Sequence, residues 1–238
     1  MLSVVVPVHN EQDNVAPLIE EIVAALRGVT PFEMVYVDDC SGDATPARLR
    51  DLLPVHPELR VLRHLQQGGQ STAVRNGVKA ARGRWIATLD GDGQNDPADI
   101  PTLLAARDAG DPATKLYAGW RVHRKDSGSK RWASKIANAI RARLLRDATP
   151  DTGCGIKLFE REAFLDLPYF DHMHRYLPAL MQRAGWKTVS VPVNHRARGS
   201  GVSNYTNLHR ALVGIADLRG VAWLIRRARR PVVEELQR

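Results

Sequence analysis

Three carboxylates follow an apolar run in the stretch WIATLDGDGQNDPADI: Asp90, Asp92 and Asp96, with a glycine between the first two. Carboxylates this close repel one another, so a bound metal ion or the water around a solvated turn must offset the repulsion. An EF-hand calcium loop is a third candidate, but it needs Gly at its sixth position and Glu at its twelfth. Counting from Asp90, those positions hold Asn95 and Pro101, which excludes an EF-hand.

Polar residues also follow two earlier apolar runs. HNE comes after LSVVVPV, and DDCSGD overlaps the end of EMVYVDD. If these runs are parallel strands, their carboxyl ends meet at one sheet edge, where ligands of such sheets bind. The carboxylates brought together there would be Glu11, Asp38, Asp39, Asp90 and Asp92. A solvated edge explains one such cluster but explains three poorly, so we predict a site for a phosphate-bearing ligand that binds with a cation.

The first 120 residues alternate short β-rich runs with helical patterns. This alternation predicts an α/β fold with a mostly parallel sheet and helices on both faces. One helix should end at Gly28, and another should begin at a capping serine, Ser71, and end at glycine. The expected strands are residues 2–8, 33–39, 60–65, 84–90 and 114–120, and the expected helices are 14–28 and 71–83.

The second half is less regular. We expect a basic helix around residues 129–146, a turn and short strand within 149–162, a helix over 174–186 and a strand over 187–195. A final helix, about residues 208–230, ends in clustered arginines, as does a helix that lies on a membrane surface. A helix packed on the core with its arginines in water is the alternative, and Trp223 favours the membrane surface. We therefore divide the chain into a catalytic domain, residues 1–206, and an amphipathic basic helix and tail, residues 207–238.

The chain has 238 residues and a net charge of +8, and its positive charge is clustered. Residues 121–146 hold nine Lys or Arg and one acid, and RGVAWLIRRARRP holds five arginines and no acid. Such clusters indicate an anionic partner, namely phosphate groups, an anionic membrane surface or nucleic acid, unless they are solvated faces. Two cysteines favour a reducing compartment, and we expect neither a signal peptide nor a membrane-spanning run. His172, His174 and His195 lack metal-ligand spacing and are expected to be structural or solvated.

VVVPVHNE, VDDCSGD, LDGDGQNDP, GWR and RGSGVSNY, in this order and spacing, resemble the family 2 inverting nucleotide-sugar glycosyltransferases of the GT-A fold. Within that family the chain is most similar to the polyprenyl-phosphate branch, which includes dolichol-phosphate mannosyltransferase and undecaprenyl-phosphate sugar transferases. The resemblance covers nearly the whole chain. It implies metal-dependent, inverting transfer of a hexose from GDP-mannose or a UDP-sugar to polyprenyl or dolichyl phosphate.

The resemblance also implies roles for individual residues. The implied metal ligands, for Mg²⁺ or Mn²⁺, are Asp90, Asp92 and Gln94. The implied catalytic residues are Asp92, Arg121 and Arg131. The implied donor-binding residues are Pro7, His9, Glu11, Val37, Asp39, Asp90, Gly91, Asp92, Arg121, Arg198 and Asn204. Two of these depart from the family pattern, because Asn204 stands where a mobile RxxGxSK loop has lysine and His9 stands where many members have tyrosine.

The expected acceptor follows from acid–base chemistry. A hydroxyl acceptor needs a general base, whereas a phosphate monoester, with a second pKa of about 6, is already mostly a dianion at pH 7 and needs cations. Cations are abundant between residues 121 and 135, and the main candidate base in the second half, Asp151, could instead orient an arginine. The chain has QRAGW where processive polysaccharide synthases carry QxxRW. A lipid phosphate is therefore favoured over a growing glycan.

Two other classes of protein and one other acceptor have to be considered. A receiver-like domain would leave DGDGQ and the basic second half unexplained, and a nucleic-acid-binding module would give the acidic edge no purpose. We therefore expect no nucleic-acid partner, but a protein that is peripheral on the cytoplasmic face of a membrane. A separate membrane subunit stays open. The alternative within the enzyme class is a soluble family 2 glycosyltransferase that uses a carbohydrate hydroxyl in cell-surface polysaccharide synthesis.

Overall fold

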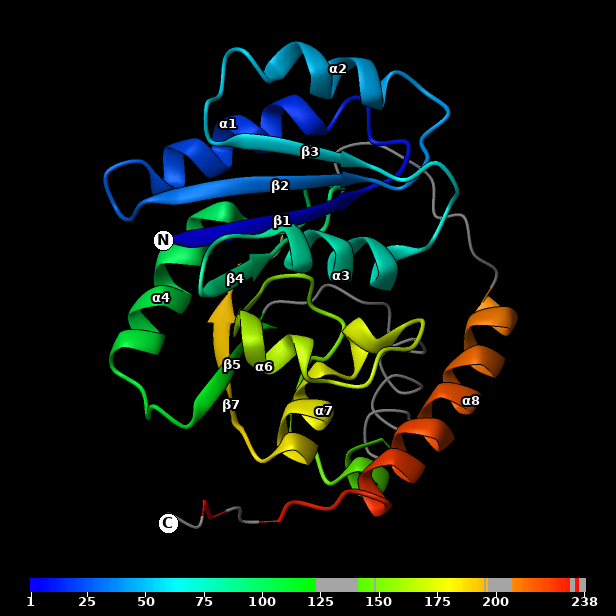
Figure 1. The fold of residues 1–238 in the computed structure, drawn as a ribbon. Coiled ribbons are helices and arrows are strands. Elements are labelled where there is room, and N and C mark those ends of the chain that lie inside the picture. Colours follow the sequence, from blue (N-terminus) through cyan, green and yellow to red (C-terminus); the bar gives the residue numbers. More distant parts are fainter. Residues whose placement is uncertain (123–140, 148, 195, 197–206, 232–233, 236–238) are drawn as a thin grey trace.

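The computed structural model describes residues 1–122, 141–147, 149–194, 196, 207–231 and 234–235. Its strands form one seven-stranded sheet in the order β3-β2-β1-β4-β6-β5-β7 (Figure 1). The strands are β1 Leu2–Val8, β2 Phe32–Asp38, β3 Leu59–Arg63, β4 Trp85–Thr88, β5 Thr114–Arg121, β6 Lys157–Glu160 and β7 Lys187–Val193.

The sheet is mostly parallel, as predicted. β1 is parallel to both β2 and β4, β2 is parallel to β3, and β5 is parallel to β7. Only β6 runs the other way, antiparallel to β4 and β5. The order β2-β1-β4 places the carboxyl ends of these three strands side by side, so the segments HNE, DDCSGD and DGDGQND do follow neighbouring strands.

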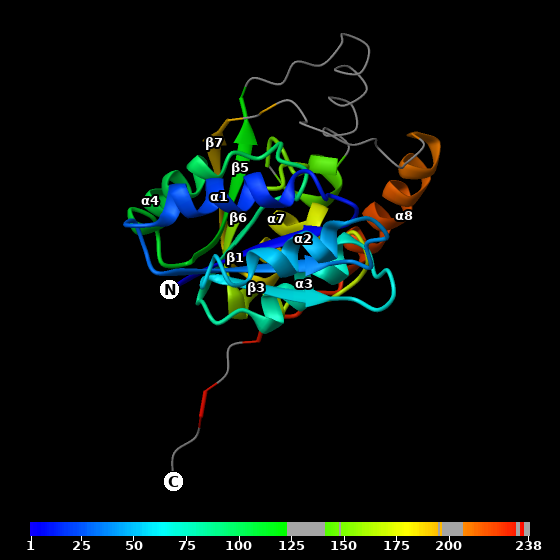
Figure 2. The same cartoon turned by 90° about the horizontal axis from the view of Figure 1, so that it is seen from above.

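Helices cover both faces of the sheet (Figure 2). Side chains alternate along β1, so that Val4 and Val6 pack with α1, α2 and α4, whereas Val5 packs with α3. Side chains of α6, α7 and α8 join the cluster around Val5. The helices are α1 Val15–Leu26, α2 Thr45–Leu52, α3 Gln70–Ala80, α4 Ile100–Asp108, α6 Arg161–Leu165, α7 Leu177–Ala184 and α8 Asn207–Arg226, with 3-10 turns η1 Pro97–Asp99 and η2 Met173–Arg175.

Two predicted helix boundaries are wrong. The structure has η2 and the shorter helix α7 where one helix over 174–186 was expected. The helix α3 begins at Gln70, follows Gly69 and ends at Ala80, so Ser71 is not its cap. Ser71 is instead buried in the first turn, because a tertiary partner takes its hydroxyl.

That partner is His174 in η2. Nδ1 of His174 lies 2.8 Å from Oγ of Ser71, and the His174 backbone N–H donates to the same oxygen over 3.4 Å. Burial, together with the positive charges of Lys157 and Arg175, holds the pKa of His174 well below its usual value of 6.5. A neutral imidazole that accepts the Ser71 hydroxyl proton at Nδ1 satisfies both groups, and it ties α3 to the chain 103 residues further on.

No helix in the part of the chain that the structure describes is both long and apolar enough to cross a bilayer. The helix α8 packs on the core through Val221 and Ala222, which are buried. It runs beside the other elements at one side of the molecule (Figure 1), and its helical conformation ends at Arg226, four residues before the predicted end.

The neutral state of His174 predicts a pH-dependent stability. In the unfolded chain this histidine takes up a proton below pH about 6.5, whereas the folded protein resists that uptake. Stability should therefore fall as the pH drops through that value, by on the order of 1 kcal/mol at pH 5.5 from this residue. Urea unfolding of the wild-type protein and of His174→Gln at pH 7.5 and 5.5 measures it.

The difference in free energy of unfolding between the two proteins reports on His174, because the other histidines are the same in both. His174→Gln should be the less stable protein at pH 7.5, and the difference in free energy of unfolding between the two proteins should be smaller at pH 5.5. A difference in free energy of unfolding that is the same at both pH values would contradict a neutral, buried imidazole.

Candidate active site

The loops after β1 and β2 are joined by reciprocal hydrogen bonds. The Asn10 backbone N–H donates to Oγ of Ser41 and the Gly42 N–H donates to Oδ1 of Asn10, each over 2.9 Å. Further along, the Ala44 N–H donates to Oε1 of Gln12 over 3.0 Å. The polar residues of the DDCSGD segment thus fix one loop against the other, which sets the position of the predicted site residues on both.

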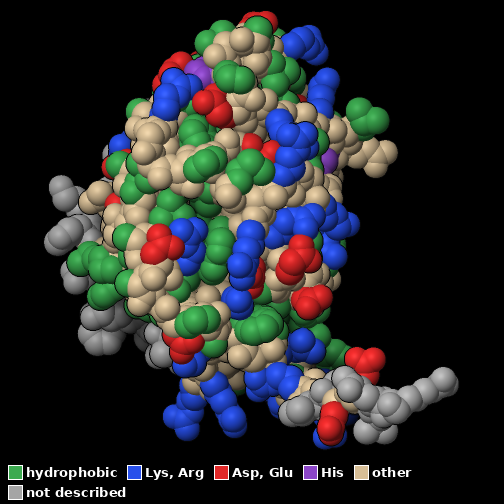
Figure 3. Space-filling view, turned by 60° about the vertical axis from the view of Figure 1, so that its left-hand side comes forward, with side chains coloured by type: hydrophobic (Ala, Val, Ile, Leu, Met, Phe, Trp, Pro, Cys, Tyr) green, Lys and Arg blue, Asp and Glu red, His purple; other side chains and the backbone are tan. Residues whose placement is uncertain are grey.

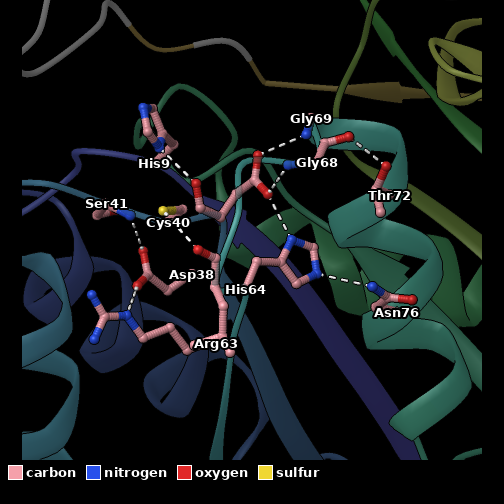
Figure 4. Close-up of polar contacts among 12 residues, drawn as sticks. His9, Asp38, Cys40, Ser41, Arg63, His64, Gly68, Gly69, Thr72 and Asn76 are labelled. Carbon is pink, nitrogen blue, oxygen red and sulfur yellow. Dashed lines mark hydrogen bonds and ion pairs between the residues drawn. The ribbon is translucent and has the colours of Figure 1, made fainter.

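Asp39 is anchored by three N–H donors (Figure 4). It accepts the backbone N–H groups of Gly68 and Gly69, each over 2.8 Å, and a bond of 2.6 Å from Nδ1 of His64. Burial alone would raise the pKa of Asp39, but these donors together lower it. Nε2 of His64 accepts from Asn76 over 2.9 Å, so the imidazole is held at both nitrogens.

Asp38 and His9 fix the same loop from either side (Figure 4). Asp38 is fully buried, accepts the Ser41 backbone N–H over 3.1 Å and pairs with Arg63 at 3.3 Å. His9 has its Nδ1 2.8 Å from the backbone oxygen of Asp39, to which it donates. Asp38 is therefore a structural residue, and His9 lies beside the anchored Asp39 as the predicted site requires.

The three acids of the DGDGQND segment have different surroundings. Asp96 turns toward η1, where it accepts the Ala98 N–H over 3.0 Å, and it pairs with Arg196 at 2.6 Å. Asp92 is buried and accepts the Gln94 backbone N–H over 3.1 Å. The segment therefore separates Asp96 from the pair that was predicted to hold a metal.

Asp90 lies where three segments converge. Its Oδ1 accepts from the side-chain amide of Gln70, at the start of α3, over 2.8 Å. A Cβ on Gly155 would lie 2.2 Å from Oδ2 of Asp90, so only glycine allows this approach. Burial raises the pKa of Asp90 and the charge of Asp92 raises it further, against the lowering effect of Lys157 and other donors. A raised pKa marks a carboxylate that a nearby cation would stabilise.

The residues around Asp90 and Asp92 fit a hard divalent ion. Carboxylate oxygens are the ligands that Mg²⁺ and Mn²⁺ prefer. Among the described residues, no group of three or more His, Cys, Asp or Glu could hold a metal ion. An ion between these two carboxylates would thus complete its coordination with water and ligand oxygens, as Mg²⁺ does with substrate phosphates. Side-chain coordination by Gln94 stays a prediction.

Arg121 and Asp151 form a bidentate pair. Nε and Nη2 of Arg121 donate to the two carboxylate oxygens of Asp151 over 2.6 and 2.9 Å, and both side chains are largely buried. The hydrogen bonds to Asp151 raise the pKa of Arg121. The expectation that Asp151 orients an arginine is confirmed, and the guanidinium is fixed at the end of β5.

Other predicted site residues are placed less directly. Pro7 is half-buried at the end of β1, and Val37 is fully buried in the core below the loop after β2. Glu11 accepts from Asn14 over 2.6 Å. Gly91 packs on β1, since a Cβ there would lie 2.6 Å from Cγ1 of Val8. Arg131, Arg198 and Asn204 lie outside the described residues, and their roles stay predictions.

Arg196 connects the end of β7 to the acidic segment. Its backbone N–H donates to the Gln94 oxygen over 3.2 Å, and its guanidinium pairs with Asp96 and with Glu21, each at 2.6 Å. This brings a residue only two positions before the predicted Arg198 next to Gln94 and Asp96 in the fold.

Sequence reasoning missed several residues that shape this site: His64, Gly68, Gly69, Gln70, Gly155 and Lys157. The glycine pair directly before a helix was the one available signal, because it indicates backbone N–H groups at a helix start. The others act through contacts between segments that are distant in sequence.

Comparison with known proteins identifies the family of the chain. Residues 3–167 match Glycosyl transferase family 2. A dodecaprenyl-phosphate galacturonate synthase of Rhizobium johnstonii is 35% identical over 97% of this chain and 69% of its own length. An undecaprenyl-phosphate 4-deoxy-4-formamido-L-arabinose transferase of Edwardsiella ictaluri is 31% identical over 86% of this chain, and this chain spans only 62% of that protein.

Solved structures share the fold at low identity. Glucosyl-3-phosphoglycerate synthase from Mycobacterium tuberculosis, in complex with UDP, has a TM-score of 0.72 at 18% identity, over 94% of this chain and 80% of that one. A mannosyltransferase from Pyrobaculum calidifontis, in complex with GDP-Man and Mn²⁺, has a TM-score of 0.68 at 19% identity, over 97% and 65%. The predicted fold is confirmed, and by sequence and fold together the chain belongs to Glycosyl transferase family 2.

Proposed function

We propose that this protein transfers a sugar from a nucleotide sugar to a polyprenyl phosphate, with inversion and with a bound Mg²⁺ or Mn²⁺. The observation that carries the proposal is the Asp90–Asp92 pair, which lies at the carboxyl end of β4 beside the anchored loops of β1 and β2. The two relatives named above act on polyprenyl phosphates by their names, which supports the acceptor. Solved neighbours that contain Mn²⁺ with UDP-glucose or GDP-Man support the donor and the ion.

The loops after β1 and β2 would form the donor half of the site. Asp39 keeps a fixed, ionised carboxylate toward the base, because three N–H donors hold it. His9 would contribute through its ring, since Nδ1 is bonded to Asp39 and Nε2 lies 3.2 Å from the Asn10 amide. Asp90 and Asp92 would hold the metal, which stabilises the charge that develops on the departing nucleoside diphosphate when it is bound.

The acceptor half of the site is inferred from the charge of the acceptor. A lipid phosphate is a dianion at neutral pH and attacks without losing a proton. It needs cations at hydrogen-bond distance, and Arg121, held rigidly by Asp151, is one of them. A hydroxyl acceptor would need a general base, and the candidate base of the second half is already committed to Arg121. This favours a phosphate acceptor over the carbohydrate alternative.

We further propose that the protein meets its lipid substrate at the membrane surface through α8. The exposed residues between 213 and 230 are Ile215, Ala216, Arg219, Gly220, Trp223, Arg226, Arg227, Arg229 and Arg230, and those up to Arg227 recur every three to four positions. The acid of this stretch, Asp217, is half-buried and pairs with His172 at 3.2 Å. Basic side chains also gather at the end of the molecule beside the C-terminal tail (Figure 3). A face of apolar and basic residues suits an anionic bilayer.

The donor site predicts a metal-dependent ligand response. With Mn²⁺, one nucleotide sugar from a panel of UDP- and GDP-sugars should raise the melting temperature, and a chelator should abolish the rise. Asp92→Asn should lose the rise and reduce transfer to a polyprenyl phosphate by about 100-fold or more, because the metal site loses a charged ligand. Melting curves and radiolabelled sugar transfer measure the two effects.

Asp96→Asn is the matched control, because Asp96 belongs to the same segment but pairs with Arg196. It should keep the Mn²⁺-dependent rise. Equal loss in both variants, or a full response in Asp92→Asn, would contradict the assignment of the metal to Asp90 and Asp92.

The outer face of α8 predicts binding to anionic membranes. Trp223, which is 56% exposed, should insert at the headgroup level, and Trp223→Ser should weaken binding to vesicles rich in phosphatidylglycerol by about tenfold. Co-sedimentation with vesicles measures the partition. Val55→Ser, at a residue 64% exposed after α2, should leave it unchanged. A wild-type protein that does not sediment with anionic vesicles would contradict this docking face.

A further inference from the structure

Lys157 is a buried lysine at the centre of the sheet. It opens β6 and lies opposite Thr88 of β4 and Ala118 of β5. Those two strands lead, within three residues, to Asp90 and Arg121. The residue is only 4% exposed, and removing an ammonium group from water costs several kcal/mol unless nearby groups compensate it.

The compensation comes from the candidate active site itself. The ammonium group of Lys157 donates to the backbone oxygen of Cys154. Burial lowers the pKa of Lys157, while the charges of Asp90 and Asp151 act in the opposite direction and favour the charged form. Lys157 in turn favours the ionised form of Asp90. Gly155, two residues before Lys157, packs against Asp90, so the lysine and this carboxylate border the same turn.

The bond to Cys154 has a geometric consequence. Cys154 lies in the turn between Asp151, which orients Arg121, and Gly155, which packs against Asp90. Thr88 supports the same turn, because its hydroxyl donates to the Gly155 oxygen over 2.9 Å. A buried cation that holds this turn thus controls the approach of Asp151 and Gly155 to the site.

We propose that Lys157 is a positioning residue that serves as the resident counter-cation of the donor site. Its charge offsets that of Asp90 whenever no divalent ion is bound, and its bond to Cys154 fixes the turn between residues 151 and 155. The metal part of this inference rests on the proposed function, whereas the charge compensation does not. A bound divalent ion takes over the compensation of Asp90, so Lys157 contributes more to the metal-free protein than to the loaded one.

A double-mutant cycle in chelator tests the compensation without any metal. Lys157→Met removes one of the cations that act on Asp90 and should lower the melting temperature, and adding Asp90→Asn removes the charge left uncompensated. The double variant should therefore melt about 3 °C or more above the additive expectation. Additive effects would overturn the proposal. If Lys157→Met alone does not fold, recovery of folding in the double variant supports it, and a double variant that stays unfolded counts against it.

Lys115 gives a matched control cycle. It is a largely buried lysine of β5 that pairs with Glu160 at 2.7 Å. Lys115→Met combined with Asp90→Asn should be additive, because Lys115 has a different carboxylate partner. Coupling of the same size in both cycles would show a general response to the loss of a lysine and would overturn the specific role of Lys157.

The response to Mn²⁺ with UDP or GDP separates compensation from simple packing. Because the ion replaces the lost charge, the rise in melting temperature with Mn²⁺ and nucleotide should be larger in Lys157→Met than in the wild-type protein. An equal loss of stability with and without the ion would show that Lys157 only fills space. A wild-type protein that ignores Mn²⁺ would contradict the proposed function, and the metal-free cycle would still decide the role of Lys157.

Discussion

Repulsion among carboxylates at the carboxyl ends of β1, β2 and β4 is the constraint that the surrounding loops must satisfy. Each acid meets it differently. Backbone N–H groups and His64 lower the pKa of Asp39, and the guanidinium of Arg196 neutralises Asp96. Asp90 is the exception, because its burial and its neighbour Asp92 raise its pKa despite nearby donors. Lys157, Gln70 and Arg121 offset part of the charge of Asp90, and a divalent cation would complete the compensation at this point of the edge.

The same constraint explains why so many motif residues have structural roles. In the DDCSGD segment, Ser41 and Asp43 bind backbone N–H groups of the facing loop, over 2.9 and 3.3 Å. Asn10 and Cys40 take left-handed conformations, with φ of 57° and 62°, to make the two loops meet. Such residues fix the loops through contacts within the protein. The motif therefore identifies a family of nucleotide-sugar enzymes better than it identifies one donor.

How much of the fold and of the site can be predicted from the sequence depends on how far apart the interacting residues lie along the chain. The parallel sheet and the three polar strand ends follow from local patterns and sheet geometry, and both are present. The sequence left Asp151 as either a base or the partner of an arginine, and the structure shows the second. The start of α3 does not follow from a local capping rule, because the hydroxyl of Ser71 is used by His174, 103 residues away. Gln70 and Lys157 were missed for the same reason. Each acts on Asp90, which folding alone brings near them.

The charge balance of Arg121 also bears on the acceptor. A guanidinium has five N–H donors, and the Asp151 pair uses two of them, so the group can still bind oxygens while its orientation stays fixed. Asp151 neutralises its charge, however, so Arg121 cannot by itself attract a dianion that approaches the anionic diphosphate of the donor. Further cations are required between donor and acceptor. Besides Arg121, and Arg141 which pairs with Asp147, the segment up to residue 146 holds seven Lys or Arg against one acid; these would meet that requirement for a phosphate acceptor and would be superfluous for a neutral hydroxyl.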